Sequence, residues 1–308
     1  MTRFPRWLCL AIVTALIAAV IPDANARQPA PRLVPIHAAV TTSNGTLVPD
    51  LSKEEFDVAI DGNRKTIERF TAPPSPLTLV LLVDMTSSMT FYTDLRDEIG
   101  RSFGPALRPG DRARVGAIAG RLLLAPRFSS RVSEIAAAGR AATDVNKDDR
   151  AGPSPIWDAV DQTVRALQDE PGVRGLILVT DGKGTGNRIS SVTAVEDAVA
   201  EGIVVQVLSE ARPMVIRQSG EVFARVRSGV MLHELAKRTG GLIVPDDPPA
   251  TGVLPPAGPI ITRLVSELRG MYTLAVAEDG PSGAYHRIAI TVKRPGLMVR
   301  TRGAYRSR

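Results

Sequence analysis

The sequence predicts an α/β protein with a doubly wound, mostly parallel sheet, extended by a small β module that both chain ends build. Leu77–Val83 and Gly175–Val179 are nearly continuous apolar runs, typical of strands buried on both faces. Between such runs, apolar residues recur at helical spacing, as strand–helix alternation requires. From Met271 onward the helical spacing stops, and short strand signals separated by Pro and Gly replace it.

The first 26 residues predict a secretory signal peptide. Arg3 and Arg6 precede an apolar stretch from Trp7 to Ile21, and Ala24-Asn25-Ala26 offers small residues for cleavage. The stretch is at the short end for a spanning helix, so an uncleaved membrane anchor is the competing interpretation. Cleavage would give a secreted or periplasmic protein and remove Cys9, the single cysteine. The mature chain would then have neither disulfides nor thiolate metal sites.

Residues 27–75 predict β structure. Strands are expected over Pro35–Val40, Phe56–Ile60 and Thr66–Phe70, and Asp61-Gly62 is a tight-turn signal that joins the last two as a hairpin. Thr71–Pro76 contains three prolines, which make a stiff linker. We therefore place a domain boundary near residue 75.

Residues 76–270 alternate strand and helix signals, which predicts a mostly parallel sheet with helices on both faces. The expected strands are Leu77–Val83, Ala113–Ile118, Arg121–Ala125, Gly175–Val179, Ile203–Leu208 and Leu242–Val244. The expected helices are Tyr92–Leu107, Ser130–Ala142, Ile156–Gln168, Val192–Glu201, Met231–Arg238 and Ile260–Arg269. Loops are expected over Thr143–Gly152 and Gly252–Pro259.

Residues 271–308 predict three more strands, Tyr272–Ala277, Arg287–Lys293 and Leu297–Arg302, with Pro/Gly turns between them. Because no helices separate them, these strands are expected to be antiparallel. We expect them to pair with the strands before Pro73 in one small β module. The α/β domain would then be inserted between the two halves of that module.

The chain is basic, and its formal net charge of +6 becomes +5 when two arginines and one aspartate leave with the signal peptide. Nucleic-acid binding is not expected of an exported protein. Between Gly280 and Arg308 there are seven Lys or Arg and no acidic residue. The simpler interpretation is a solvated strand face, since Arg300 and Arg302 alternate with Val299 and Thr301. The other is contact with anionic envelope polymer or lipid.

The apolar run Leu77–Val83 ends in Asp84, and two hydroxyl residues follow at alternate positions, Thr86 and Ser88. In open α/β sheets, ligands bind beyond the carboxyl ends of the strands, where this loop is expected to lie. One carboxylate and two hydroxyl oxygens form a hard ligand set of low charge, which suits Mg²⁺ or Mn²⁺ better than Zn²⁺. If this loop binds a metal, magnesium or manganese is therefore expected.

This D-x-T-x-S spacing resembles the metal-ion-dependent adhesion site of the von Willebrand factor A family, whose pattern is D-x-S-x-S with a distant Thr and a later T-D-G. Here Asp181 stands in the later T-D-G, and Ser154, in a loop before an expected helix, stands in place of the distant Thr. Thr86 stands where the pattern usually has Ser. Both departures from the pattern, Thr86 and Ser154, keep a hydroxyl oxygen. The resemblance implies a Rossmann-like fold and a metal held by Asp84, Thr86, Ser88, Ser154 and Asp181. It also implies an acidic side chain, Asp or Glu, of a partner protein as the last ligand.

The flanking segments Val48–Phe70 and Ile290–Tyr305 are similar to those of a bacterial group of secreted von Willebrand factor A-related proteins. What this likeness implies about function is export and metal-assisted protein binding.

The candidate residues also have purely structural interpretations. Asp84 and Asp181 could cap turns at strand ends, where Asp is common. Thr180 is expected to be an ordinary strand-end residue, and Asp158 is expected to serve the start of its helix. Trp157 belongs either to the core or to the rim of the site.

An enzyme is not expected. A phosphotransferase of the haloacid dehalogenase type needs a second Asp two residues after the first, where this chain has Thr86. Gly152–Ile156 lacks the final glycine of a nucleophile elbow. No histidine pair has the spacing of zinc ligands.

The segment Ser209–Gly229 follows an expected strand end and contains Met214, Ile216 and Phe223. We expect it to flank the same edge of the sheet and, with Trp157, to contribute partner selectivity; a packed surface hairpin is the alternative. The leading hypothesis is an exported, metal-dependent protein-binding module. The alternative is a structural envelope protein with a vestigial metal site, whose basic C-terminal module binds anionic surface material.

Overall fold

The computed structural model describes residues 32–89, 99–210, 214–218, 221–226, 229–245, 255–278 and 280–307. Of residues 99–100, 214–218 and 221–226 only the backbone is described. The predicted signal peptide and the first part of the predicted Tyr92–Leu107 helix lie outside the described residues. Among the helices that are described, none combines the length and the apolar character needed to cross a bilayer.

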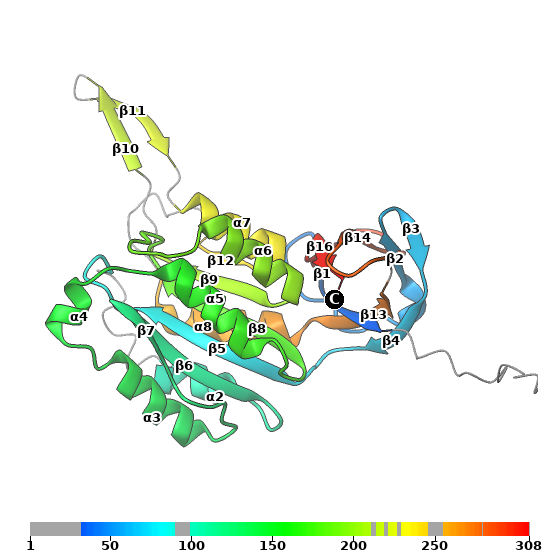
Figure 1. The fold of residues 1–308 in the computed structure, drawn as a ribbon. Coiled ribbons are helices and arrows are strands. Elements are labelled where there is room, and N and C mark those ends of the chain that lie inside the picture. The colour runs from blue at the N-terminus through cyan, green and yellow to red at the C-terminus, as the bar shows by residue number, and fades with distance from the viewer. Residues whose placement is uncertain are drawn as a thin grey trace, which may run out of the picture. The chain divides into compact units, whose positions relative to one another are not determined.

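The central sheet has six described strands in the order β12-β9-β8-β5-β6-β7 (Figure 1). Neighbouring strands are parallel, except that β7 is antiparallel to β6. Read from β7 to β12 and numbered along the chain, this order is 3-2-1-4-5-6, a doubly wound arrangement that confirms the predicted fold class. The strands are β5 (Leu77–Asp84), β6 (Arg112–Ala119), β7 (Arg121–Leu124), β8 (Val173–Thr180), β9 (Val204–Ser209) and β12 (Ile243–Val244).

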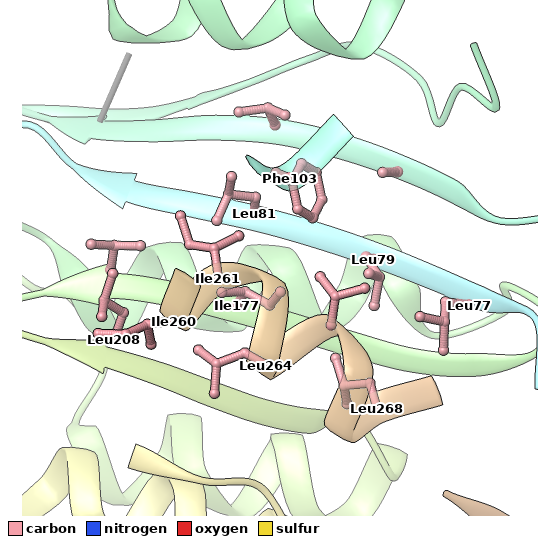
Figure 2. Packing of buried hydrophobic residues seen from close by; sticks show 14 of the residues in the cluster. Leu77, Leu79, Leu81, Phe103, Ile177, Leu208, Ile260, Ile261, Leu264 and Leu268 are labelled. Atoms are coloured by element: carbon pink, nitrogen blue, oxygen red, sulfur yellow. The ribbon is translucent and has the colours of Figure 1, made fainter. Parts of the chain in front are cut away.

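Strand β5 is buried on both faces, and its residues alternate between two apolar layers. Leu79 and Leu81 belong to one layer, and Val80 and Leu82 belong to the other. Figure 2 shows Leu264 and its helix on the first layer. That layer is covered by η2 (Ile99–Phe103), α2 (Gly104–Ala106), α3 (Val132–Thr143) and α8 (Ala257–Arg269). The second is covered by α5 (Ile156–Leu167), α6 (Ser191–Glu201) and α7 (Val230–Thr239).

The β module consists of two four-stranded antiparallel sheets, in the orders β15-β1-β13-β4 and β16-β14-β2-β3. Strand β1 lies between β13 and β15, and β2 pairs with β14, so both chain ends build the module. The strands are β1 (Leu33–Thr42), β2 (Phe56–Ile60), β3 (Asn63–Lys65), β4 (Ile67–Thr71), β13 (Tyr272–Ala277), β14 (Tyr285–Val292), β15 (Leu297–Thr301) and β16 (Ala304–Arg306). A 3-10 turn, η1 (Lys53–Glu55), precedes β2.

The strand predicted over Thr66–Phe70 is present as β4 (Ile67–Thr71), but its predicted hairpin with Phe56–Ile60 is wrong. Asn63–Lys65 continues the hairpin with β2, whereas Ile67–Thr71 pairs with β13 in the other sheet. The chain therefore changes sheets at Thr66, between β3 and β4. This change depends on pairing with a strand about two hundred residues later, which the local sequence pattern does not encode.

Two predicted loops contain helix. Residues 147–151 form α4 (Lys147–Ala151) within the predicted Thr143–Gly152 loop, and the Asn146 side chain caps it by accepting from the Asp149 N–H at 2.8 Å. Helix α8 starts at Ala257, three residues before the predicted start. Pro259 is tolerated there because the first-turn N–H groups have no partner within the helix.

The prediction of a solvated face for Arg300 and Arg302 is wrong. Arg302 is only 6% exposed and donates to the Val199 carbonyl, in the last turn of α6, at 2.9 Å. Arg300 donates to the Gly240 carbonyl at the end of α7 and to the Glu267 carboxylate of α8, both at 2.6 Å. Cations are favoured at helix C-termini, so these arginines join the β module to three helices of the α/β domain.

Protonation of His37 is expected to destabilise the fold at low pH. Burial, and then the charges of Arg174 and Arg302, lower the pKa of His37 from 6.5 to about 3. The unfolded chain therefore takes up this proton at a higher pH than the folded chain. The contribution of neutral His37 to the free energy of unfolding is fully present above the unfolded pKa of 6.5. This contribution is lost as the pH falls from 6.5 toward 3. Between pH 7 and pH 5, we expect the free energy of unfolding to fall by about 2 kcal/mol from this residue.

Urea unfolding at the two pH values, on the wild type and on His37→Gln, measures this effect. The variant should lose less stability on acidification, because it has no imidazole to protonate. An equal loss in both proteins would assign the pH dependence to other groups.

Candidate functional site

Asp84 is the centre of a hydrogen-bonded cluster at the carboxyl end of β5. It is 1% exposed. Its Oδ1 accepts from the Thr86 N–H at 3.0 Å and the Thr86 hydroxyl at 2.6 Å. Its Oδ2 accepts from the Ser154 hydroxyl at 3.1 Å and the Thr180 hydroxyl at 2.8 Å. Three side-chain hydroxyls thus surround one buried carboxylate.

The strand register explains why Thr180 is in this cluster. Val83 of β5 pairs with Val179 of β8, so Asp84 and Thr180 are the next residues on adjacent strands. Alternate residues of a strand share a face, so Asp84 and Thr180 lie on the side of the sheet that Val80 and Leu178 face. Helix α5 covers this side, and Ser154 lies just before its start. Thr180 was predicted to be an ordinary strand-end residue. The register between β5 and β8, together with the alternation of side chains along a strand, could have identified Thr180 as a neighbour of Asp84.

Ser154 is held by the loop that follows Asp181. The Ser154 N–H donates to the Thr185 hydroxyl at 2.9 Å, and the Thr185 N–H donates to the Ser154 carbonyl at 2.8 Å. Ser154 itself is 3% exposed. Thr185 was not predicted as part of the site, because nothing in its own sequence context pairs it with a residue about thirty positions earlier. Its role is to position Ser154.

Ser88 and Thr86 lie together in the loop after β5. Their hydroxyl oxygens are 3.3 Å apart, and Ser88 is half-buried whereas Thr86 is buried. The intervening Ser87 donates its N–H to the Arg150 carbonyl at 2.8 Å, which fixes this loop against the end of α4. The structure therefore brings four of the five predicted metal ligands, Asp84, Thr86, Ser88 and Ser154, into one hydrogen-bonded cluster.

Asp181, the fifth predicted ligand, is buried just beyond Thr180 and faces a lysine. Its Oδ1 accepts the Lys183 N–H at 3.0 Å. Its Oδ2 accepts no hydrogen bond, although the Lys183 ammonium lies 3.0 Å away, at ion-pair distance but outside hydrogen-bond geometry. The Lys183 side chain is 70% exposed and that of Asp181 is 3% exposed. The lysine thus provides a solvent-exposed positive charge beside this carboxylate.

Replacement of Lys183 by Met is expected to strengthen Mg²⁺ binding. The ammonium competes with a metal cation for the negative charge of Asp181. Because the Lys183 side chain is exposed to solvent, its interaction with Asp181 is weak, and we expect the Mg²⁺ dissociation constant to fall about two- to fivefold. Isothermal titration calorimetry of wild type, Lys183→Met and the exposed Lys237→Met on α7 measures it. Weaker binding by Lys183→Met, or an equal gain in Lys237→Met, would contradict the proposed competition.

Two other predicted residues have structural contacts. Trp157 is 9% exposed and packs in the apolar layer with Val80 and Leu82, so it belongs to the core. Asp158 accepts from the N–H groups of Arg188 and Ile189 at 2.9 to 3.1 Å. It therefore holds the loop after β8 against α5, in addition to lying in the first turn of that helix.

The predicted partner-binding residues Met214, Ile216 and Phe223 lie on β10 (Met214–Gln218) and β11 (Glu221–Val226), an antiparallel hairpin that forms a separate two-stranded sheet. Their side chains are outside what the structure describes. The backbone shows that the segment is a hairpin, which was the structural alternative for this segment.

The residues of the cluster fit a hard divalent cation. Among the described residues, no three His, Cys, Asp or Glu gather at one place, so such a cation would depend on hydroxyl oxygens. A hydroxyl that donates its one proton to Asp84 keeps its lone pairs for another partner. Every side-chain atom of the cluster that could coordinate a metal is an oxygen, the ligand type that Mg²⁺ and Mn²⁺ prefer.

No protein-family model matches the chain, and no curated protein matches its sequence. Solved structures are similar to it. One is a von Willebrand factor type A protein from Catenulispora acidiphila, with 14% identity, 89% of this chain and 72% of that chain covered, and a TM-score of 0.48. Another is the conserved hypothetical protein BatB from Bacteroides thetaiotaomicron, with 19% identity, 62% and 98% covered, and a TM-score of 0.45. A third is the manganese-loaded TRAP protein of Plasmodium vivax, with 14% identity, 82% and 99% covered, and a TM-score of 0.43.

Proposed function

We propose that this chain is an exported protein-binding module whose site takes Mg²⁺ or Mn²⁺ together with an Asp or Glu side chain of a partner protein. One observation supports this most directly. Asp84, buried at the switch point between β5 and β8, accepts hydrogen bonds from three hydroxyls that come from three separate segments. Ligands of open α/β sheets bind at this kind of position.

Thr86, Ser88 and Ser154 would hold the cation through their hydroxyl oxygens. Both oxygens of Asp84 already accept two hydrogen bonds each, so this residue would orient the hydroxyls and balance charge. Asp181 would contribute directly or through water. When bound, the cation supplies positive charge and a coordination position for one more oxygen. Because most direct ligands would be neutral hydroxyls, the site would still attract a carboxylate.

Binding is a better proposal than catalysis for this site. A general base needs a free acceptor atom within reach of the proton that it takes. The lone pairs of Asp84 are all used by internal donors, and the one oxygen of Asp181 that accepts no hydrogen bond, Oδ2, lies 3.0 Å from the Lys183 ammonium. We therefore propose no reaction.

The test is partner capture from envelope extract by the wild type, with Mg²⁺ and with EDTA, and by Ser154→Ala at equal folded concentration. Ser154→Ala should capture less, since a metal ligand is lost. A matched control is Ser190→Ala, which removes the cap of α6 at the Thr193 N–H and should cost about 0.5–2 kcal/mol of stability with no loss of capture. Equal capture by all three proteins, unaffected by EDTA, would leave the metal-dependent function without support.

Export is proposed from the sequence, because the residues concerned lie outside the described structure. Cleavage after Ala26 would make Arg27 the first residue of the exported protein. Amino-terminal sequencing of periplasmic or secreted material should therefore start at Arg27. Recovery of a chain that retains Met1, in a membrane fraction, would instead indicate an anchored protein.

The alternative of a basic C-terminal module that binds anionic material is less well supported. Arg294 pairs with Asp50 and Glu55, and Arg300 and Arg302 are used at the contact with the α/β domain. Much of the positive charge seen in the sequence is thus engaged within the protein.

A further inference from the structure

The hairpin of β10 and β11 is inserted between β9 and α7 and pairs with no other strand among the described residues (Figure 1). A two-stranded ribbon is at best marginally stable by itself in water. Each of its strands also has an outer edge with no described strand beside it, and such edges are templates for another extended chain. The hairpin therefore has the backbone features of an incomplete sheet.

The described residues on either side of the hairpin segment lie beside the site. On one side, the Glu210 N–H, directly after β9, donates to the Thr180 carbonyl at 2.9 Å. On the other side, Gly229 precedes α7 and lies against Gly182: a Cβ built on Gly182 would be 3.5 Å from the Gly229 Cα. Gly182 has a φ of +78°, which also favours glycine there. The described residues that flank this segment, Glu210 and Gly229, thus lie next to the Thr180–Gly182 strand end.

The register gives the two faces of the hairpin different compositions. Met214 is opposite Val226 and Ile216 is opposite Ala224, so one face has four apolar positions in succession. The other face carries the pairs Val215–Arg225 and Arg217–Val222. Glu221 is the single acidic residue of the two strands. One face of the hairpin is therefore mostly apolar and ends in the polar pair Gln218–Glu221, and the other face has two arginines and two valines.

We propose that a strand of the partner protein adds to this hairpin, and that the strand is extended, has apolar residues at alternate positions and is otherwise acidic. This rests on the proposed function, because the same partner would place its Asp or Glu at the cluster around Asp84. Strand addition takes its affinity from main-chain hydrogen bonds and its specificity from alternate side chains. A second copy of this chain would add strands with the same two arginines, Arg217 and Arg225, and one acidic residue, so their charges would repel. A strand with acidic residues is complementary in charge.

The probe is a capped peptide of about eight residues that begins with Asp and then alternates Val with Glu, long enough for one strand. A second version is N-methylated at alternate residues, and a third has Lys in place of every acid. Fluorescence polarisation gives their affinities for the mature chain with Mg²⁺ and with EDTA. The variants are a Gly-Ser replacement of residues 214–226, the double charge reversal Arg217→Glu/Arg225→Glu, and Asp84→Asn.

We expect the replacement of residues 214–226 to weaken binding of the acidic peptide about tenfold or more, and N-methylation to weaken binding to the wild type by a similar factor. The shortened protein, in which Gly-Ser replaces residues 214–226, should bind the acidic peptide and its N-methylated version with equal affinity. EDTA should still weaken this binding. The charge reversal should lower affinity for the acidic peptide and raise it for the Lys peptide, a gain that a misfolded protein could not show.

The proposal is overturned if the wild type does not bind the acidic peptide, or if the shortened protein binds it equally well. It is also overturned if sedimentation shows a dimer of the wild type that disappears in the shortened protein, since the hairpin would then join two copies of this chain. If the hairpin variants weaken binding but EDTA and Asp84→Asn do not, strand addition stands and the metal-dependent function fails.

Discussion

Replacement of Arg269 by Met is expected to lower the free energy of unfolding by about 3–5 kcal/mol, because it breaks a buried ion pair and leaves a carboxylate uncompensated. Arg269, at the end of α8, is 7% exposed and Asp111, just before β6, is 2% exposed. The guanidinium donates to both carboxylate oxygens, at 2.6 and 3.2 Å. Bidentate pairs of a guanidinium and a carboxylate are stronger than hydrogen bonds between neutral groups. Asp111 also accepts the Leu77 N–H at 2.9 Å, so the pair connects α8 with the start of β5.

Equilibrium urea unfolding measures this loss, with Arg131→Met as the matched control. Arg131 pairs with Glu134 on the surface and its side chain is 74% exposed, so its removal should change the stability by less than about 1 kcal/mol. Equal losses in the two variants would show that the burial of the Arg269 pair has no special effect. The same experiment with Mg²⁺ should give the same difference, since this pair lies at the opposite end of β5 from Asp84.

The central sheet could be predicted because its signals are local. A strand buried on both faces needs apolar residues at every position, and Leu77–Asp84 is buried throughout. The contribution of both chain ends to one β module could be inferred from the absence of helical spacing there. The details could not: β1 lies between β13 and β15, and the change of sheets at Thr66 is set by those distant pairings.

Members of the hydrogen-bonded cluster around Asp84 could be predicted where a motif has fixed spacing, and could not where their contacts depend on strand register. Asp84, Thr86 and Ser88 are neighbours in sequence, and resemblance supplied Ser154, which the structure places on the same carboxylate. Thr180 was missed although its strand had been identified. A parallel register with β5 was needed to show that this residue, and not Asp181, shares the face of Asp84.

The arginines near the end of the chain show that a clear local pattern can give a wrong prediction. Alternation of Arg300 and Arg302 with Val299 and Thr301 is the usual pattern of a half-exposed strand. The solvent side of that strand is occupied here by the ends of α6, α7 and α8, so the arginines bind carbonyls and Glu267. Only the packing of the β module against the α/β domain reveals this.

Replacement of Asp84 by Asn is expected to remove stabilisation by Mg²⁺ while keeping the metal-free protein folded. In the wild type, Mg²⁺ at about a hundred times its dissociation constant should raise the free energy of unfolding by about 2.7 kcal/mol. The Asn side chain keeps one acceptor oxygen for the Thr86 N–H, and its amide can donate to the rotatable hydroxyls of Ser154 and Thr180. It lacks the negative charge that balances a divalent cation.

Replacement of Asp84 by Ala should be more damaging even without metal. Four donors would lose their acceptor: the N–H and hydroxyl of Thr86 and the hydroxyls of Ser154 and Thr180. A buried donor left without an acceptor costs about 1–3 kcal/mol, and hydroxyls that turn to other acceptors reduce the sum, so we expect a loss of about 2–4 kcal/mol. Urea unfolding of the wild type and both variants, with Mg²⁺ and with EDTA, separates the two effects. If Asp84→Asn keeps the Mg²⁺ stabilisation of the wild type, the cation binds elsewhere, and the cluster around Asp84 is a structural hydrogen-bond network at the end of β5.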